Sequence, residues 1–326
     1  MMLDLVKRLF ISFAAMALTG CATVPSPAEP TSPLRLRANT GAIESAPILL
    51  AARDYFPGGL EVRRGAIPNL VGAENIPGVF EPGPADVATH AETQALRYSL
   101  KNPEIRIILT VTEGHYRVVA RKSAGIATLA DLKGKRIGTL PGTSAAYFLN
   151  RMLLSANISP QDVDIVKVPI AELAPQLAAQ TIDAVAIWDP YGERAAVAIG
   201  EDLVSFSDRA VYREIFNLNT TAEKLADPVL RAEMVKLVRA IIAATADMKR
   251  APARAQQIAT HVTGFDPAEV SGAWSHMVFP ASLPDDLLDV MVEEEKWLAE
   301  QAERPARSRE QLAKLIDSSV LEEALR

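Results

Sequence analysis

Short apolar runs of β-branched residues alternate with helical segments over much of this chain, and this alternation restricts the fold more than any other feature. Strands are expected at 34–37, 105–111, 117–120, 136–138, 165–168 and 184–188, and helices at 47–53, 145–156 and 173–180. Such an order is typical of α/β folds with largely parallel sheets. From Asp227 onward the pattern is almost wholly helical.

The length and the composition narrow the possibilities further. About 290 residues follow the N-terminal segment, which is too long for one small core and suits two lobes. The formal net charge of −6 and the lack of an arginine-lysine cluster in the sequence argue against a nucleic-acid partner. Aromatic residues make up only 6% of the chain, which argues against a large stacking surface for polymers.

The N-terminus has the pattern of a bacterial lipoprotein signal. Lys7 and Arg8 precede an apolar run that ends in Leu18-Thr19-Gly20-Cys21. The run is about half the ~20 residues that a membrane-spanning helix needs, so we expect removal of residues 1–20. Cys21, the only cysteine, is expected to carry the lipid. Residues 21–33 are expected to form a flexible tether. The alternative is an ordinary signal peptide with an unmodified cysteine. The predicted location is the cell envelope, on the periplasmic or outer face of a membrane.

Two corners between a strand and a helix carry candidate ligand-binding residues. Gly142, Thr143 and Ser144 precede a helix whose free backbone N–H groups could bind an anion or a polar group. Capping of that helix by Thr143 or Ser144 is the structural alternative. Glu44 and Ser45 lie between the first strand and the first helix, where they either face a ligand or cap the helix.

A third candidate segment is Trp188-Asp189-Pro190-Tyr191, which ends an apolar strand. Ligands of open α/β sheets bind at the carboxyl ends of strands, so we expect Trp188, Asp189 and Tyr191 to contact the ligand. Asp189 followed by Pro190 is also an ordinary start of a helix.

Several of these motifs, in their order and spacing, resemble one group of transport proteins. The segments are 127–138 (ATLADLKGKRIG), 142–144, Ile182-Asp183-Ala184 and 188–191. They resemble the nitrate/sulfonate/taurine group of ABC-transporter solute-binding proteins, which is similar to the binding proteins for thiamine-pyrimidine precursors. Thr181 departs from the pattern, because the family usually has glycine there.

The resemblance implies a fold and further site residues. The expected fold is α/β, the two-lobed type II periplasmic-binding-protein fold, with a ligand cleft between the lobes and a helical C-terminal region. Chain crossings near Ala120 and Ser207 would give lobe 1 residues 34–119 and 208–326, and lobe 2 residues 120–207. The family positions also make candidates of four residues, each with a structural alternative such as a turn aspartate or a surface histidine: Asp86, Thr89, His115 and Asn217.

The implied function is a lipid-anchored, monomeric solute-binding component of an ABC importer, with a permease and its ATPase as partners. The ligand would be a sulfonate, nitrate, taurine or an aminopyrimidine. The candidate loops carry carboxylates and no arginine, which favours a ligand with a cationic or N–H donor part. A ligand-sensing receptor of the same fold is an alternative.

An enzyme is less favoured. The sequence has no Gly-x-Ser-x-Gly elbow, Walker loop or His-Glu-x-x-His pair, and its four histidines lack metal-ligand spacing. We therefore expect no metal and no cofactor. A fungal pyrimidine synthase related to this group carries a cysteine-rich motif that this chain lacks.

Overall fold

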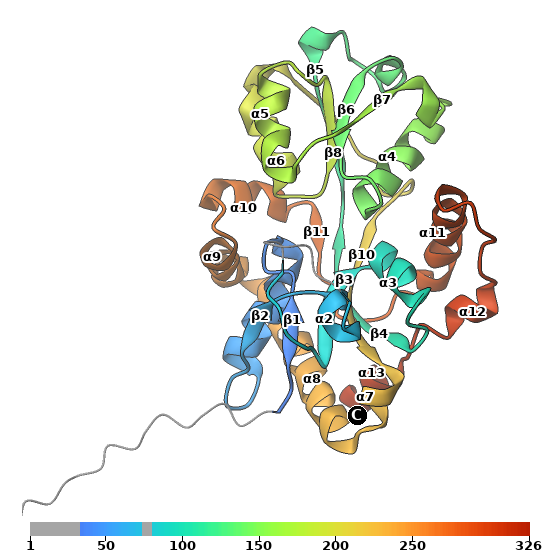
Figure 1. Cartoon of the computed structure of the whole chain (residues 1–326). Coiled ribbons are helices and arrows are strands. Elements are labelled where there is room, and N and C mark those ends of the chain that lie inside the picture. The colour runs from blue at the N-terminus through green and yellow to red at the C-terminus, as the bar shows by residue number, and fades with distance from the viewer. Residues whose placement is uncertain (1–32, 74–79) are drawn as a thin grey trace, which may run out of the picture.

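The computed structural model describes residues 33–73 and 80–326, and its strands form two separate sheets (Figure 1). The first sheet has the order β11-β4-β10-β3-β1-β2. Its strands are β1 (Leu36–Ala38), β2 (Val62–Arg64), β3 (Val87–Ala91), β4 (Ile105–Gly114), β10 (Glu214–Thr221) and β11 (Met277–Val278). The second sheet has the order β7-β6-β8-β5-β9. Its strands are β5 (Arg117–Arg121), β6 (Arg136–Thr139), β7 (Asp164–Lys167), β8 (Ala184–Ile187) and β9 (Leu203–Phe206).

The chain crosses between the sheets twice. It leaves the first sheet after β4, which ends at Gly114, and enters the second at Arg117, the start of β5. It returns between Phe206 and Glu214. The lobe boundary expected near Ala120 therefore falls inside β5, whose pairing with β8 and β9 fixes it in the second sheet.

Both sheets are mixed, so the expectation of largely parallel sheets is wrong. β1 pairs in parallel with β2 and β3, and β6 with β7 and β8. The strands next to the crossings run the other way: β10 is antiparallel to β3 and β4, and β5 to β8 and β9. A strand that returns from the other lobe enters the sheet from its opposite end. This direction decides which end of β10 faces the second sheet.

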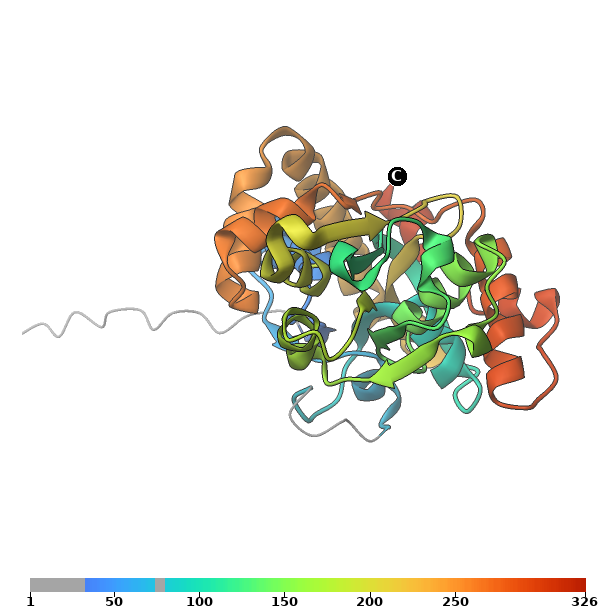
Figure 2. The same cartoon turned by 90° about the horizontal axis from the view of Figure 1, so that it is seen from above.

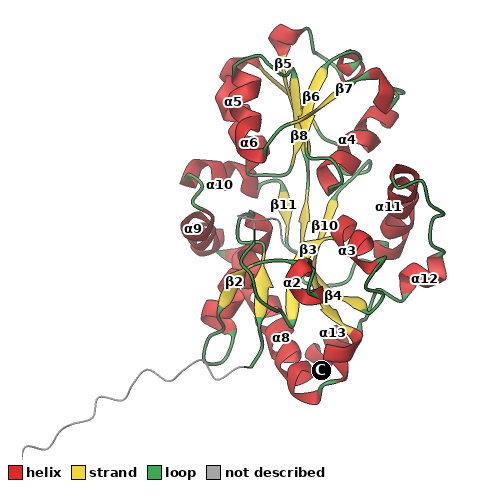
Figure 3. Ribbon diagram, in the orientation of Figure 1, coloured by secondary structure: helices red, strands yellow, loops and turns green. Residues whose placement is uncertain are grey.

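Helices cover both sheets (Figure 3). In the second sheet, α5 (Leu173–Ala178) and α6 (Tyr191–Ile199) lie on one side and α4 (Ser144–Ser155) on the other. The first sheet carries α1 (Ala46–Leu50), α2 (Ile67–Val71) and α3 (Glu92–Ser99). Shorter helical turns are η1 (Ile43–Ser45), η2 (Ala51–Tyr55), η3 (Lys122–Ala124), η4 (Leu129–Leu132), η5 (Pro160–Asp162), η6 (Ile170–Glu172) and η7 (Gly200–Asp202).

The C-terminal third is almost wholly helical, as the sequence predicts, apart from the short strand β11. Its helices are α7 (Ala222–Ala226), α8 (Pro228–Arg250), α9 (Pro252–Thr263), α10 (Pro267–Trp274), α11 (Leu287–Gln301), α12 (Arg309–Ala313) and α13 (Ser319–Ala324). Helices α9 and α10 lie on one side of the molecule and α11 and α12 on the other (Figures 1 and 2).

Each sheet has its own apolar core. One large cluster packs α1, α8, α9, α10 and α13 against the first sheet, and a smaller one packs α2, α3, α11 and α12 against the same sheet. Another large cluster packs α4, α5 and α6 against the second sheet. Cys21 and the rest of the predicted signal and tether up to residue 32 lie outside the described residues. In the part of the chain that the structure describes, no helix combines the length and apolar character needed to cross a membrane.

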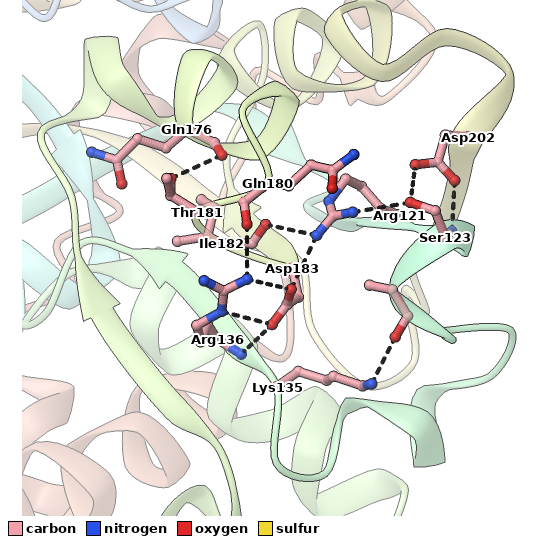
Figure 4. A network of polar contacts seen from close by, with 11 residues as sticks. Arg121, Ser123, Lys135, Arg136, Gln176, Gln180, Thr181, Ile182, Asp183 and Asp202 are labelled. Carbon is pink, nitrogen blue, oxygen red and sulfur yellow. Dashed lines mark hydrogen bonds and ion pairs between the residues drawn. The ribbon is translucent and has the colours of Figure 1, made fainter.

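Two sequence motifs of the second lobe form a polar network at the edge of its sheet (Figure 4). Asp183, just before β8, accepts hydrogen bonds from the backbone N–H and the guanidinium of Arg136 at 2.8–3.1 Å, and from Arg121 at 3.1 Å. The left-handed residue of the preceding turn is Gln180, with φ 64°, so glycine is not required at Thr181. These residues start β6 and β8, so the network lies at the sheet edge opposite the carboxyl ends of those strands.

Candidate functional site

A small cavity of about 50 Å³ lies where the two sheets face one another. It is lined from the first-sheet side by Asn39, Ala42, Glu44, His90, Ala91, Gln94, Glu214 and Phe216, and from the second-sheet side by Thr143, Ser144 and Trp188. These residues come from the carboxyl ends of β1, β3 and β8, from the loop after β6 and from the amino end of β10. Ligands of α/β sheets bind at such ends, so this cavity is the candidate site.

A larger cavity of about 640 Å³ lies between α3, α4 and α11, away from most strand ends. Its wall combines apolar side chains such as Trp297 and Leu100 with Arg97 and Arg304. We favour the smaller cavity as the ligand site because its walls carry buried polar groups from several strand ends, whereas the larger one is a groove along helices.

The first-sheet wall of the cavity holds two buried carboxyl groups. Glu44, on η1, is 1% exposed, and Glu214, the first residue of β10, is 4% exposed. The two carboxyl groups lie close enough to influence each other's protonation, and the Oε2 atom of each is buried without a hydrogen bond to another group of the described residues. Burial raises the pKa of Glu44 to about 8, and burial together with the charges of Glu44 and Glu92 raises that of Glu214 well above its ordinary value.

Tyr116 and Gly114 complete the surroundings of this carboxyl pair. The Tyr116 hydroxyl lies 3.0 Å from Ser144 Oγ, and it acts on Glu214 by lowering the pKa of that group against the larger effect of burial, so it lies between the walls that the two sheets contribute. Gly114 pairs with Glu214 across the strands β4 and β10. A Cβ atom at position 114 would lie 2.9 Å from Glu214 Oε2. Glycine here therefore leaves room for the carboxyl group.

The second-sheet wall combines one aromatic ring with the start of a helix. Trp188 is half-buried, and the centre of its ring lies 6.3 Å from the centre of the Tyr116 ring and 6.4 Å from that of the Tyr191 ring. Thr143 precedes α4, but its side chain does not cap that helix; its hydroxyl donates to the carbonyl of Leu140 at 2.7 Å. Thr143 therefore does not cap α4 with its side chain; its backbone carbonyl accepts from the N–H groups of Ala146 and Tyr147.

The remaining polar residues of the lining carry no positive charge. Burial and the charge of Arg97 lower the pKa of His90 to about 3, so its ring is neutral at pH 7. Arg97 donates to the Gly142 carbonyl at 2.7 Å and to Gln94 Oε1 at 3.1 Å. In the residues that the structure describes, the lining contains no lysine or arginine. No three His, Cys, Asp or Glu side chains of that part are placed to hold a metal ion.

Four of the residues predicted from sequence line the cavity: Glu44, Thr143, Ser144 and Trp188. Three others, Gly142, Tyr191 and His115, do not line it. The Gly142 carbonyl accepts hydrogen bonds from the side chains of Gln94 and Arg97 on α3. Tyr191 packs edge-on against Phe265. His115 lies at the first crossing, where its backbone N–H donates to the carbonyl of His276.

Asp189 does not line the cavity, and its carboxylate has several partners in the protein. Its carboxylate accepts from Arg117 at 3.1 Å and from the backbone N–H of Glu193 at 2.9 Å, and lies 2.7 Å from His276 Nδ1. Helix α6 begins at Tyr191, one residue later than the predicted start at Pro190. With its oxygens committed to these partners, Asp189 organises the strand end.

Four further candidates do not line the cavity, and their side chains have partners within the first lobe. Asp86 lies at the far, amino end of β3 and binds the Arg35 guanidinium at 2.5 and 2.8 Å. Asn217 is buried in the middle of β10, where it accepts from Thr110 at 2.8 Å. Thr89 accepts from the backbone N–H of Asn39, and Ser45 donates to the Asn39 carbonyl.

Sequence reasoning missed Asn39, His90, Gln94 and Glu214 as lining residues. Asn39 and His90 end or follow the parallel strands β1 and β3, so the rule of carboxyl ends could have found them. Glu214 is at the start of its strand. Only the antiparallel direction of β10, which the sequence does not reveal, brings that amino end to the cavity.

Comparison with known proteins identifies the relatives of this chain. The sequence model of the NMT1/THI5-like family matches residues 43–255, more than half of the chain. The chain belongs to the NMT1/THI5-like family. Curated relatives from Brucella abortus and Brucella melitensis, named as binding proteins, are 38% identical over 74 residues. The matched stretch is 23% of this chain and 23% of each relative's length.

Solved structures show the fold of this NMT1/THI5-like protein. The alkanesulfonate-binding protein SsuA from Xanthomonas axonopodis pv. citri, bound to MOPS, has a TM-score of 0.65 and 20% identity over 88% of this chain and 99% of its own. The periplasmic nitrate-binding protein NrtA from Synechocystis PCC 6803 has a TM-score of 0.65 and 13% identity over 91% of this chain and 89% of its own. The fold is therefore that of two-lobed periplasmic binding proteins, as expected from the sequence.

The same fold also occurs in an enzyme. The desulfurization enzyme DszB has a TM-score of 0.59 and 13% identity over 89% of this chain and 98% of its own. The fold of this NMT1/THI5-like protein thus serves both binding and catalysis, and the residues of its own site must decide between them.

Proposed function

We propose that this protein is the solute-binding component of an ABC importer and captures a small polar molecule between its two lobes. The observation that carries the proposal is the composition of the cavity wall, to which both sheets contribute: Glu44 and Glu214 from one side, Thr143, Ser144 and Trp188 from the other. A ligand held by both walls stabilises the closed arrangement over an open one, which is how binding drives lobe closure. A permease and its ATPase would take up the closed, loaded form.

Binding fits the cavity better than catalysis. The hydroxyl of Ser144 is the candidate nucleophile in the lining, and it pairs with the Tyr116 hydroxyl and not with a base. The candidate base in the lining is His90, whose Nδ1 accepts a hydrogen bond from the backbone N–H of Ala91. Activation of a serine needs a base within hydrogen-bond reach. The relatives named as binding proteins in Brucella support the same choice.

A thermal-shift screen tests solute binding directly. The protein is unfolded with sulfonates, nitrate, taurine and pyrimidine derivatives in turn, because a ligand at ~100 times its dissociation constant stabilises by about 2.7 kcal/mol. Small-angle scattering then compares the radius of gyration with and without each hit, and a decrease on binding is expected. A hit that is converted to a product would point instead to an enzyme of this fold.

We also propose that Cys21 anchors the protein to a membrane, which rests on the signal pattern of residues 1–20. Cys21→Ser should leave the protein unlipidated and absent from membranes extracted with detergent. Mass spectrometry of the wild type should find a lipid on the N-terminal peptide. A Cys21→Ser protein that still fractionates with membranes, together with an unmodified wild type, would refute the anchor.

A further inference from the structure

The buried carboxyl pair of Glu44 and Glu214 is an acceptor site with unused capacity. Both side chains are more than nine-tenths buried, both line the cavity, and each leaves its Oε2 without a partner in the described chain. A buried polar atom without a partner costs free energy, because it has lost its hydrogen bonds to water. Two such atoms at one cavity mark a place where a bound molecule supplies the missing donors.

The described surroundings of the carboxyl pair supply no cation that would balance an anion. Glu44 and Glu214 have no lysine or arginine beside them among the described lining residues, and His90 is neutral. Arg97, whose charge acts on His90 of the lining, is already hydrogen-bonded to Gly142 and Gln94. A sulfonate or nitrate at this wall would meet two carboxyl groups without a compensating cation. The first N–H groups of α4 lie on the opposite wall.

The second-sheet wall favours a flat cation. Trp188 is half-buried and lines the cavity opposite the carboxyl pair, and an indole ring attracts a cation placed over its face. Burial raises the pKa of both carboxyl groups, so they hold protons in the ligand-free protein, and a bound cation would favour their ionised form. A planar group with several N–H donors then matches the carboxylate oxygens while it lies against the ring. An alkyl ammonium lacks this planarity.

On this basis, and resting on the proposed solute-binding function, we propose that the cleft binds its ligand through a planar N–H donor cation of the amidinium type, held by Glu44 and Glu214 against Trp188. This class of ligand differs from the sulfonates and nitrate that the solved structures of the same fold bind according to their names. At such low identity those proteins share the fold with this chain and not necessarily the ligand.

The test titrates the full chain, purified in detergent, with two pairs of probes of similar shape: acetamidinium against methanesulfonate, and benzamidinium against benzenesulfonate. Isothermal titration calorimetry should show binding of the amidinium probes, with the sulfonates at least roughly tenfold weaker. Glu44→Gln and Glu214→Gln keep the size of the side chain and should weaken amidinium binding roughly tenfold or more.

Two further variants keep the result interpretable if a site variant folds poorly. Glu294→Gln is the matched control, because Glu294 is also fully buried with an unpartnered Oε2 but does not line the cavity; it should bind the amidinium probes as the wild type does. Gly114→Ala introduces a Cβ 2.9 Å from Glu214 Oε2 and displaces the tip of that side chain without removing its charge. It should weaken amidinium binding severalfold.

Three outcomes overturn the proposed ligand class: sulfonates that bind as tightly as their amidinium counterparts, amidinium binding that Glu44→Gln and Glu214→Gln leave unchanged, or no amidinium binding at millimolar concentration. Sulfonate binding alone would refute the amidinium class and retain the proposed solute-binding function. The function itself fails separately, if the screen of small molecules finds no ligand that stabilises the protein.

Discussion

Glu294 and Glu295 are neighbours on helix α11, and both side chains are fully buried, yet their environments are opposite. Glu294 accepts only the Thr93 hydroxyl, at 2.6 Å, among the described residues. Glu295 accepts from Arg304 at 2.6 Å and from Arg307 at 2.9 Å. Burial raises the pKa of Glu294 well above its ordinary value. Burial acts on Glu295 too, but hydrogen bonds from the two arginines outweigh it and lower its pKa to about 2.

These opposite shifts predict opposite effects of pH on the free energy of unfolding. In the ligand-free folded protein burial raises the pKa of Glu44 to about 8, that of Glu92 to about 7 and that of Glu294 well above its ordinary value, so these groups hold their protons. In the unfolded chain they release them near their ordinary pKa of 4.5. Their contribution to stability is therefore present below pH ~4.5 and is lost as pH rises toward 8. Glu295 contributes in the other direction, and its contribution is lost as pH falls from ~4.5 toward 2.

Glu294→Gln and Glu295→Gln test this sign. Urea unfolding at pH 5 and pH 8 gives the free energy of unfolding of the variant and of the wild type. The difference, Glu294→Gln minus wild type, should be more favourable to the variant at pH 8 than at pH 5. Glu295→Gln should lose about 2–3 kcal/mol at pH 7, because Arg304 and Arg307 lose a buried charged acceptor. Equal effects of the two substitutions at both pH values would contradict the assignment.

A second prediction concerns the network in Figure 4. Asp183→Asn replaces an acceptor of two arginines and a backbone N–H with a group that is half donor, so we expect a loss of about 1–3 kcal/mol of stability. Ligand affinity should not change, because the network lies at the opposite edge of the second sheet from the cavity. Chemical unfolding and ligand titration of the same protein separate the two effects. A loss of affinity in a normally stable variant would show that the network reaches the site.

Asp183 and Glu214 illustrate what the sequence could and could not predict. Strand and helix positions followed from local periodicity, and the strand expected at 136–138 and the helix expected at 145–156 agree with β6 and α4 within a residue. The fold followed from the resemblance of motifs such as Ile182-Asp183-Ala184, although Asp183 itself holds the sheet edge together. The site needed tertiary information. Asp86 and Asn217 find partners within the first lobe, and Glu214 reaches the cavity only because β10 is antiparallel.

A third prediction concerns contact between the lobes. Arg194 on α6 and Glu269 on α10 form a two-pronged ion pair at 2.7 Å, and the Arg194 guanidinium lies 4.5 Å from the centre of the Phe265 ring. Helix α6 belongs to the second sheet, whereas α10 follows the helices of the first (Figure 1). The pair therefore favours the closed arrangement. It is partly exposed, so its contribution is about 1 kcal/mol at most.

Glu269→Gln should weaken ligand binding by up to about fivefold and increase the radius of gyration of the ligand-free protein. The matched control is Glu323→Gln, which removes an ion pair with Arg231 between α8 and α13 and should leave both quantities unchanged. Small-angle scattering and titration measure the two. If Glu323→Gln weakens binding as much as Glu269→Gln, the ion pair between α6 and α10 has no specific role in closure.

The last prediction concerns Trp188, whose ring is half-buried between the cavity and the rings of Tyr116 and Tyr191. Full burial in the core of the second lobe would make Trp188→Ala cost about 3–5 kcal/mol of stability. Because one side of the ring faces the cavity, we expect a smaller cost to stability and a loss of more than ~1 kcal/mol in binding. Trp188→Phe keeps an aromatic face and should restore part of the affinity. Denaturant unfolding and ligand titration of both variants measure the two quantities. Unchanged affinity in a folded Trp188→Ala protein would remove this ring from the site and leave Thr143 and Ser144 as its contacts from the second lobe.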